Sequence, residues 1–298
     1  MSVAQPVFRF APSPNGELHL GHAYSALLNL QMARRCNAKM LLRIEGIDTQ
    51  RCTAALEKQM LEDLEWIGFE WDEEPIRQSG RFDLYQDALL KIDELGLLYA
   101  SGMSRSEIKR EVTKLESAGT PWPRDPDGSP IYPGKERELR DSPRKPLSKT
   151  IGRQIIRLDM AMAKAKINDP LFWNEMASNG NMDVNPEEVK AEPAVWGDVI
   201  LARRDVPTSY HIACVIDDAA QGVTHVVRGK DLYFATAIHR LLQHLLGLPA
   251  PVYFHHELIR NDERQKLSKS DGHTSLRQLR NSGLSPMDVI DRMGLSLL

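Results

Sequence analysis

Two histidines lie where a strand-like segment gives way to a helix-forming one, in the tetrapeptide His19-Leu20-Gly21-His22 near the N-terminus. Free backbone N–H groups at a helix start attract anions, and imidazoles that face the same point can donate to phosphate oxygens. This arrangement predicts a phosphate-binding site. The tetrapeptide alone more often marks partly exposed or core histidines, and its position at the helix start is what favours a function.

Two lysines lie three residues apart in a polar segment near the C-terminus, in Lys266-Leu267-Ser268-Lys269-Ser270. Mobile ammonium groups with hydroxyl groups between them can neutralise a polyphosphate. A charge run in a polar loop is usually only a solvated surface, so this motif is a weak signal by itself.

The elements that must position these motifs alternate between strands and helices, which is typical of a parallel α/β sheet. Hydrophobic periodicity predicts strands at 7–11, 41–44, 198–203, 209–217 and 223–229, and helices at 23–35, 53–68, 82–96 and 231–247. We expect Thr53, Ser104 and Ser285 to cap helices, with Glu107 completing a capping box. Between 98 and 193 the pattern is interrupted by a series of prolines, which predicts an insertion rich in loops and turns.

Composition and charge are those of an ordinary folded protein. Hydrophobic residues make up 42% and charged residues 27% of the 298-residue chain, which excludes disordered and low-complexity sequence. No apolar run approaches the roughly 18 residues of a membrane span, and no secretory pattern is visible, so we expect a cytoplasmic protein without membrane contact. The cysteines Cys36, Cys52 and Cys214 have no Cys-x-x-Cys spacing and are expected to be free thiols.

The two motifs occur in an order that marks one enzyme family. H-L-G-H after the first expected strand and K-L-S-K-S after the last is the signature pair of class I aminoacyl-tRNA synthetases, which this chain resembles. The segments that resemble the glutamyl branch of that family are 9–23, 41–48, 209–218, 222–232 and 266–270. A chain that ends soon after K-L-S-K-S and carries R-G-K-D-L resembles the glutamyl-queuosine tRNA(Asp) synthetases, short paralogues of glutamyl-tRNA synthetase.

The resemblance implies an α/β fold with a Rossmann-like class I synthetase catalytic domain, a parallel sheet, an inserted α+β subdomain and a short C-terminal helical segment. We place the catalytic domain at 1–97 and 194–273, the inserted, acceptor-side subdomain at 98–193, and the helical segment at 274–298. The stretch after K-L-S-K-S is too short for an anticodon-binding domain, so we expect none. We also expect a monomer.

The resemblance further implies a pocket for L-glutamate, formed by Arg9, Phe10, Ala11, Pro12, Ser13, Glu45, Tyr210 and Arg228. Two carboxylates call for two cationic partners, and the planar guanidinium groups of Arg9 and Arg228 can bind them bidentately. The family assigns Arg9 to the side-chain carboxylate and Arg228 to the α-carboxylate, while Glu45 would accept from the ammonium group. The alternatives are structural salt bridges for the arginines, a pair with Arg43 for Glu45, and a core aromatic role for Tyr210.

The implied reaction needs no protein nucleophile. The glutamate carboxylate attacks the α-phosphorus of ATP, so catalysis reduces to positioning and to stabilising charge on the phosphoryl group. His19, His22, Lys266 and Lys269 are the expected catalytic residues, and the implied ATP contacts are His19, Gly21, His22, Lys266, Ser268 and Lys269. Mg²⁺ is expected to arrive with ATP.

In the resembled family the acceptor is queuosine at the wobble position of tRNA(Asp). The alternatives are a truncated glutamyl-tRNA synthetase that charges the terminal adenosine, and a non-catalytic amino-acid or nucleotide sensor. With a net charge of −3, RNA affinity must come from a few basic patches. The candidates are Arg34, Arg35, Lys39, Arg144, Lys145, Lys149, Arg153, Arg157, Arg203 and Arg204.

The sequence departs from the family at three places. Many relatives hold a structural zinc in the insertion through three cysteines and a tyrosine, and here those positions read Ser101, Met103, Tyr132 and Glu136. These side chains cannot make a thiolate-rich tetrahedral site, so we predict no zinc. Gly46 stands where the family commonly has aspartate. Cys214 stands where the larger glutamyl enzymes often have asparagine, and we interpret it as a small buried residue of a strand.

Overall fold

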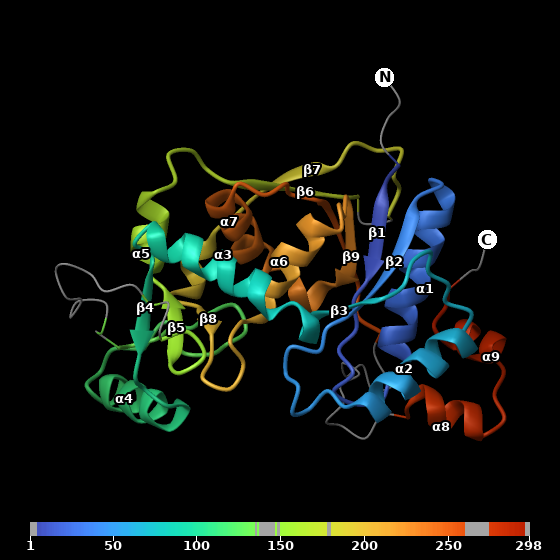
Figure 1. Cartoon of the computed structure of the whole chain (residues 1–298), viewed down its shortest axis with the longest axis horizontal. Helices are drawn as coiled ribbons and strands as arrows, with labels where there is room; N and C mark the ends of the chain where they lie inside the picture. Colours follow the sequence, from blue (N-terminus) through green and yellow to red (C-terminus); the bar gives the residue numbers. More distant parts are fainter. Residues whose placement is uncertain are drawn as a thin grey trace.

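A seven-stranded sheet runs through the molecule in the order β3-β2-β1-β9-β10-β6-β7 (Figure 1). The computed structural model describes residues 5–134, 136, 147, 150–177, 180–259 and 274–295, so Lys266, Ser268 and Lys269 lie outside the described residues. The strands are β1 (Val7–Phe10), β2 (Lys39–Ile44), β3 (Ile76–Arg77), β6 (Phe172–Glu175), β7 (Glu187–Lys190), β9 (His225–Gly229) and β10 (Val252–His256). Neighbouring strands are parallel except for β6 and β7, which confirms the expected α/β fold.

A second, antiparallel sheet has the order β4-β5-β8, with β4 (Leu98–Ser101), β5 (Ile155–Leu158) and β8 (Ile200–Ala202). Strands between residues 98 and 193 therefore join both sheets, since β6 and β7 belong to the large one. The domain boundaries at 98 and 193 stay a prediction, and they do not coincide with the division between the two sheets.

Helices connect the strands. They are α1 (Leu20–Arg35), α2 (Ala54–Trp66), α3 (Phe82–Glu94), α4 (Arg105–Ser117), α5 (Met160–Ala165), α6 (Tyr210–Ala220), α7 (Thr236–Leu246), α8 (Leu276–Asn281) and α9 (Pro286–Arg292). Of these, α1 and α7 pack against strands of the large sheet. None of the helices in the described part of the chain is long and apolar enough to span a membrane.

Side-chain caps explain where several helices begin. The Thr53 hydroxyl accepts a hydrogen bond from the Leu56 backbone N–H at 3.3 Å, which starts α2. Ser104 and Glu107 form the expected capping box of α4, and Ser285 caps α9. These three predictions from the sequence are confirmed.

The segment 209–217 forms the helix α6, so the predicted strand at this place is wrong. Ser209 caps the helix, because its hydroxyl accepts from the Ile212 backbone N–H at 3.4 Å. The helix packs against α3, α7 and β8, so apolar residues are needed on most of its surface. A short, mostly apolar segment of this kind is compatible with a buried strand as well as with a buried helix. Cys214 is buried as expected, but in a helix.

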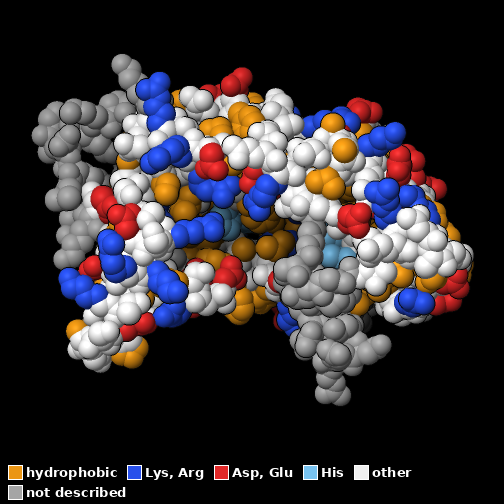
Figure 2. Space-filling view, turned by 90° about the horizontal axis from the view of Figure 1, so that it is seen from below, with side chains coloured by type: hydrophobic (Ala, Val, Ile, Leu, Met, Phe, Trp, Pro, Cys, Tyr) orange, Lys and Arg blue, Asp and Glu red, His pale blue; other side chains and the backbone are white. Residues whose placement is uncertain are grey.

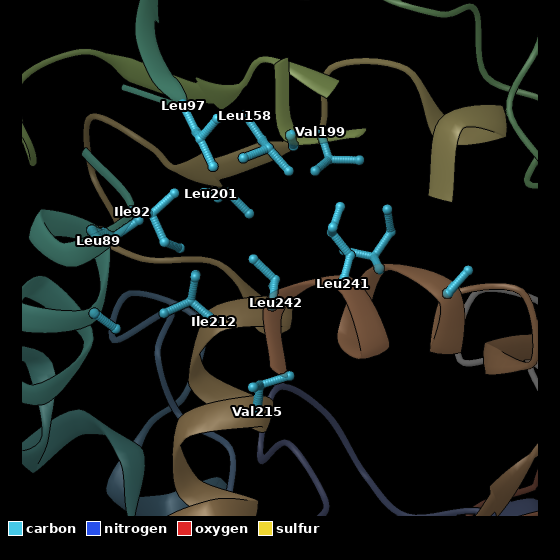
Figure 3. Close-up of a cluster of buried hydrophobic side chains, with 14 of the residues drawn as sticks. Leu89, Ile92, Leu97, Leu158, Val199, Leu201, Ile212, Val215, Leu241 and Leu242 are labelled. Carbon is cyan, nitrogen blue, oxygen red and sulfur yellow. The ribbon is translucent and has the colours of Figure 1, made fainter. Parts of the chain in front are cut away.

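One hydrophobic core joins the two sheets (Figure 3). Side chains from α3, α6 and α7 pack against side chains from β5, from β8 and from the residues that flank β4 and β8. Burial of each large apolar side chain stabilises the fold by roughly 1.5–3 kcal/mol. The labelled members are Leu89, Ile92, Leu97, Leu158, Val199, Leu201, Ile212, Val215, Leu241 and Leu242. This packing fixes the small sheet relative to α6, whose first residues also line the candidate site.

Candidate active site

A cavity of about 420 Å³ opens where the carboxyl ends of β1 and β9 lie side by side. Chain order reverses between these strands, because β2 follows β1 on one side and β10 follows β9 on the other. Ligands of open α/β sheets bind at such switch points. The residues of the cavity wall that the sequence predicted are Arg9, Phe10, Ala11, Pro12, Ser13, His19, Gly21, His22, Glu45, Tyr210 and Arg228.

The two histidines of the H-L-G-H motif build the start of α1. His19 Nδ1 accepts from the Gly21 backbone N–H at 3.1 Å, and His22 Nδ1 accepts from the His19 backbone N–H at 3.2 Å. The rings lie 3.9 Å apart between centroids. Since both Nδ1 atoms accept, each neutral ring carries its proton on Nε2. The Gly21 N–H is therefore not free, contrary to our expectation for this helix start.

A buried charge cluster lies at the β1 and β2 end of the cavity. Asp218 Oδ1 accepts from Arg9 Nε at 3.1 Å and from Arg43 Nη1 at 2.6 Å, and Arg43 Nη2 donates to Glu45 Oε1 at 3.1 Å. Burial would raise the pKa of Asp218, but Arg9 and Arg43 outweigh it and lower this pKa to about 2. Burial raises the pKa of Glu45 in spite of both arginines.

The two terminal guanidinium nitrogens of Arg9 are the part of this cluster that can contact a ligand. Its side chain is only 4% exposed, and Asp218 holds its Nε. The two terminal nitrogens of Arg9 have no hydrogen-bond partner among the described residues, so they can bind a carboxylate in the cavity. Glu45 lines the cavity and also pairs with Arg43, so the two interpretations of this residue are compatible.

Arg228, on β9, directs its guanidinium group to five protein acceptors. They are His255 Nε2 at 3.1 Å, His239 Nδ1 at 3.2 Å, the Tyr210 hydroxyl at 3.3 Å, the Leu232 carbonyl at 3.2 Å and the Thr236 hydroxyl at 2.7 Å. A guanidinium group has five N–H donors, so this set uses all of them. A ligand carboxylate would exchange for one of these partners, and Tyr210 and Leu232 are the two that also line the cavity.

Neutral histidines surround Arg228. Burial and Arg228 lower the pKa of His211 to about 4, and burial with Arg228 lowers that of His239 well below its usual range. Burial also lowers the pKa of His255 to about 4, although Glu175 acts in the opposite direction. His255 Nδ1 lies 2.8 Å from Glu175 Oε2, which keeps the proton on Nδ1 and leaves Nε2 as the acceptor for Arg228. The buried cation thus gains acceptors without a second buried charge beside it.

The positions that hold zinc in many relatives form a different network. The Tyr132 hydroxyl donates to Glu136 Oε1 at 2.7 Å, and the Arg157 guanidinium lies 3.8 Å from the centre of the Tyr132 ring. Arg157 Nε donates to the Ser101 hydroxyl at 3.2 Å. Three of the four positions thus contact one another or a guanidinium cation, so this donor set does not fit zinc. Arg157 is buried, which corrects our inclusion of it among the RNA-binding candidates.

The sequence did not identify several residues of the site. Asp218, His239, His255 and Thr236 hold the two key arginines, yet no local motif marks them. One signal was available: two adjacent aspartates, Asp217 and Asp218, end an apolar run, and carboxylates are rarely fully buried unless they are paired. At Gly46 a Cβ would meet only Cys52, at 3.7 Å, so space does not require glycine there.

Comparisons with known proteins indicate one family of enzymes. The family model "tRNA synthetases class I (E and Q), catalytic domain" matches residues 6–297. The chain is 44% identical to Glutamyl-Q tRNA(Asp) synthetase of Rhodobacter capsulatus over 97% of this chain and 100% of that relative. It is 34% identical to Glutamate–tRNA ligase 2 of Syntrophus aciditrophicus, over 99% of this chain and 58% of that protein.

Solved structures give the same result. A glutamate-tRNA synthetase from Elizabethkingia anophelis matches with a TM-score of 0.68 and 28% identity, over 94% of this chain and 54% of that one. The chain thus spans little more than half the length of the glutamate–tRNA ligases that it matches. Methionyl-tRNA synthetase of Mycobacterium tuberculosis, at 14% identity and a TM-score of 0.54, shares the fold. The chain belongs to the class I tRNA synthetases of the glutamyl and glutaminyl (E and Q) family, and it is a ligase.

Proposed function

We propose that this protein activates L-glutamate with ATP and transfers the glutamyl group to queuosine at the wobble position of tRNA(Asp). The observation that carries the proposal is the placement of Arg9 and Arg228, both buried, in the same cavity as His19 and His22. A cavity with two guanidinium groups beside a phosphate-binding helix start suits a dicarboxylate next to a nucleotide.

Charge favours glutamate over its uncharged amide. Three buried guanidinium groups, on Arg9, Arg43 and Arg228, face the buried carboxylate of Asp218 and the partly buried carboxylate of Glu45. This set has a net charge of +1, and glutamate at neutral pH brings −1. Because a buried net charge is costly, a ligand that neutralises the set binds better than glutamine, which has no net charge.

Each group of the ligand has a partner in the proposed complex. The side-chain carboxylate binds the terminal nitrogens of Arg9, the α-carboxylate lies beside Arg228 and Tyr210, and the ammonium group donates to Glu45. This places the α-carboxylate on the β9 side of the cavity, and His19 and His22 line the same cavity.

Activation then needs only positioned donors. An oxygen of the α-carboxylate attacks the α-phosphorus of ATP, the bond to pyrophosphate breaks, and glutamyl adenylate forms. His19 and His22 line the cavity and would contact phosphate oxygens whose charge grows in the transition state. Lys266 and Lys269 are proposed for the same role from the sequence. Mg²⁺ would neutralise the departing pyrophosphate and would be carried by the ATP phosphates.

In the second step a hydroxyl oxygen attacks the acyl carbon and AMP leaves with the bonding electron pair, while the hydroxyl proton is lost to solvent or phosphate. The relative that this chain matches over its whole length is a Glutamyl-Q tRNA(Asp) synthetase, which supports a queuosine hydroxyl as the acceptor. The match to glutamate–tRNA ligases supports the other candidate, the terminal adenosine of a tRNA(Glu).

Two assays test the proposal. We expect glutamate-dependent exchange of pyrophosphate into ATP without any tRNA, followed by transfer of labelled glutamate to tRNA(Asp) that contains queuosine and not to tRNA(Asp) that lacks it. Transfer to the terminal ribose of tRNA(Glu) would support the ordinary synthetase instead. Absence of exchange would support a sensor.

Substitution Lys269→Ala should abolish exchange and leave the circular dichroism spectrum and the melting temperature unchanged. The reason is that the ammonium group is proposed to act on phosphate charge. An unchanged exchange rate would contradict the role of K-L-S-K-S.

A further inference from the structure

A second cavity, of about 370 Å³, adjoins the first one. The two share Ser13, Glu45 and Tyr210 in their walls. These are residues of the proposed glutamate end, whereas His19 and His22 line only the first cavity. A ligand in the second cavity therefore approaches the site from the amino-acid side and not from the side of the ATP phosphates.

Three arginines line this second cavity, and each comes from a different part of the chain. Arg51 follows β2, Arg105 is the first residue of α4, and Arg203 follows β8. Figure 2 shows a hollow in this face of the molecule with Lys and Arg side chains gathered around it. Convergence of guanidinium groups on one hollow is the chemistry that recognises phosphate.

Asp48 balances only part of this charge. Its Oδ2 lies 2.7 Å from Arg51 Nε and 3.8 Å from Arg203 Nη2. Arg105 has no ion pair with any residue in the described ranges. Since Glu45 is paired with Arg43, the three arginines and Asp48 leave the second cavity with a charge of +2.

We propose that the second cavity binds the sugar–phosphate backbone of the RNA strand that presents its hydroxyl to the glutamyl adenylate. Arg51, Arg105 and Arg203 bind the phosphate that flanks the acceptor nucleoside, and the nucleoside passes Tyr210 and Ser13 into the first cavity. This inference rests on the proposed function, because it requires an RNA acceptor. Asp48 holds Arg51 and Arg203 in place until the phosphate binds.

The position of the cavity separates this role from that of binding ATP. A strand that fills the second cavity leaves the H-L-G-H side open for the nucleotide, so RNA and adenylate can be bound together. The basic candidates at the far end of α1 differ, because Arg34 pairs with Glu70 and Lys39 pairs with Glu73 outside either cavity.

The test compares Arg203→Ala and Arg105→Ala with the matched control Arg292→Ala, which removes an exposed arginine of α9 that lines neither cavity. Pyrophosphate exchange and transfer of labelled glutamate to queuosine-containing tRNA(Asp) are measured on the same preparations over a series of salt concentrations. Loss of one charge-assisted phosphate contact should lower the transfer rate relative to the exchange rate about tenfold. The affinity for tRNA(Asp) should also depend less on salt. The slope of its logarithm against the logarithm of the salt concentration should decrease in magnitude by about one for each arginine removed. The control should change neither quantity.

Three outcomes overturn the inference. If the unaltered protein transfers glutamate to no tRNA, the proposed function and this inference fail together. If it transfers normally and the two variants behave like Arg292→Ala, only the inference fails. If exchange falls as much as transfer in Arg203→Ala, the second cavity belongs to the ATP phosphates and not to RNA.

Discussion

Replacing Asp218 by asparagine tests whether a buried carboxylate positions the guanidinium group that binds substrate. The substitution keeps the shape of the side chain and removes the charge that Arg9 and Arg43 share. We expect two separate effects, on stability and on glutamate binding, because Asp218 touches Arg9 inside the protein while the other end of Arg9 faces the cavity.

The structure gives the size of the first effect. Arg9 and Arg43 lower the pKa of Asp218 from 3.8 to about 2 against the effect of burial, and a shift of this size corresponds to about 2 kcal/mol. Removing one partner of a buried ion pair costs about 3 kcal/mol, because the other partner stays buried without its counter-ion. For a chain of this length the melting temperature should fall by about 6 °C.

The same carboxylate makes part of the stability depend on pH. A carboxyl whose folded pKa is depressed contributes stability that is present above its unfolded pKa, near 4, and that is lost as pH falls toward 2. The Asp218→Asn variant should lack this contribution, so it and the unaltered protein should differ less in stability at pH 2 than at pH 7.

The second effect is measured by glutamate-dependent pyrophosphate exchange. Without its anchor, Arg9 should bind the side-chain carboxylate poorly, and the KM for glutamate should rise about tenfold while the KM for ATP stays the same. Asp217→Asn is the matched control. Asp217 is equally buried on the same helix, but it accepts from Gln78, Arg81 and Tyr85 and makes no hydrogen bond to Arg9.

Both variants should therefore lose stability, and only Asp218→Asn should change the KM for glutamate. An equal change of KM in the two variants would mean that general loosening of α6 is responsible. A normal KM in Asp218→Asn would refute the positioning role of this carboxylate.

Two further predictions follow from other parts of the structure. His211, His239 and His255 are held neutral with lowered pKa values, so their contribution to stability is complete above pH 6.5 and decreases as pH falls. The folded pKa is about 4 for His211 and His255, and that of His239 is also lowered well below its usual range. Urea unfolding at several pH values below 6.5 should show a slope of up to about 4 kcal/mol per pH unit, and a flat profile would contradict it. Gly197→Ala should destabilise the protein by about 2 kcal/mol or more, measured by thermal unfolding, because φ is +60° at this residue and a Cβ would lie 2.5 Å from Ile131; Gly80→Ala, where nothing lies near a Cβ, is the control.

Sequence patterns could predict the elements with a strong local signal. The caps of α2, α4 and α9 depend on residues three apart, and the H-L-G-H motif is at a helix start in the structure as it is in the sequence. The resemblance to a family could also indicate residues that line one cavity, from Arg9 to Arg228. Their individual roles stay predictions.

Long-range contacts and ambiguous apolar runs could not be predicted in this way. Asp218 is 209 residues from Arg9 and 175 from Arg43, and only the packing of α6 against the sheet brings the three together. The sequence pattern predicts a strand in place of this helix, because a short, mostly apolar segment is compatible with either element. With the segment taken as a strand, nothing indicates that the two acids at its end meet the arginines of the site.

The network of Arg157, Tyr132, Glu136 and Ser101 has a consequence for how the protein is made. A zinc site must be filled from the cell's metal supply before its part of the chain is stable, whereas a guanidinium group and a carboxylate are synthesised together with the chain. Folding of this region therefore does not depend on the supply of zinc. The four positions also carry no cysteine thiolate that an oxidant could modify.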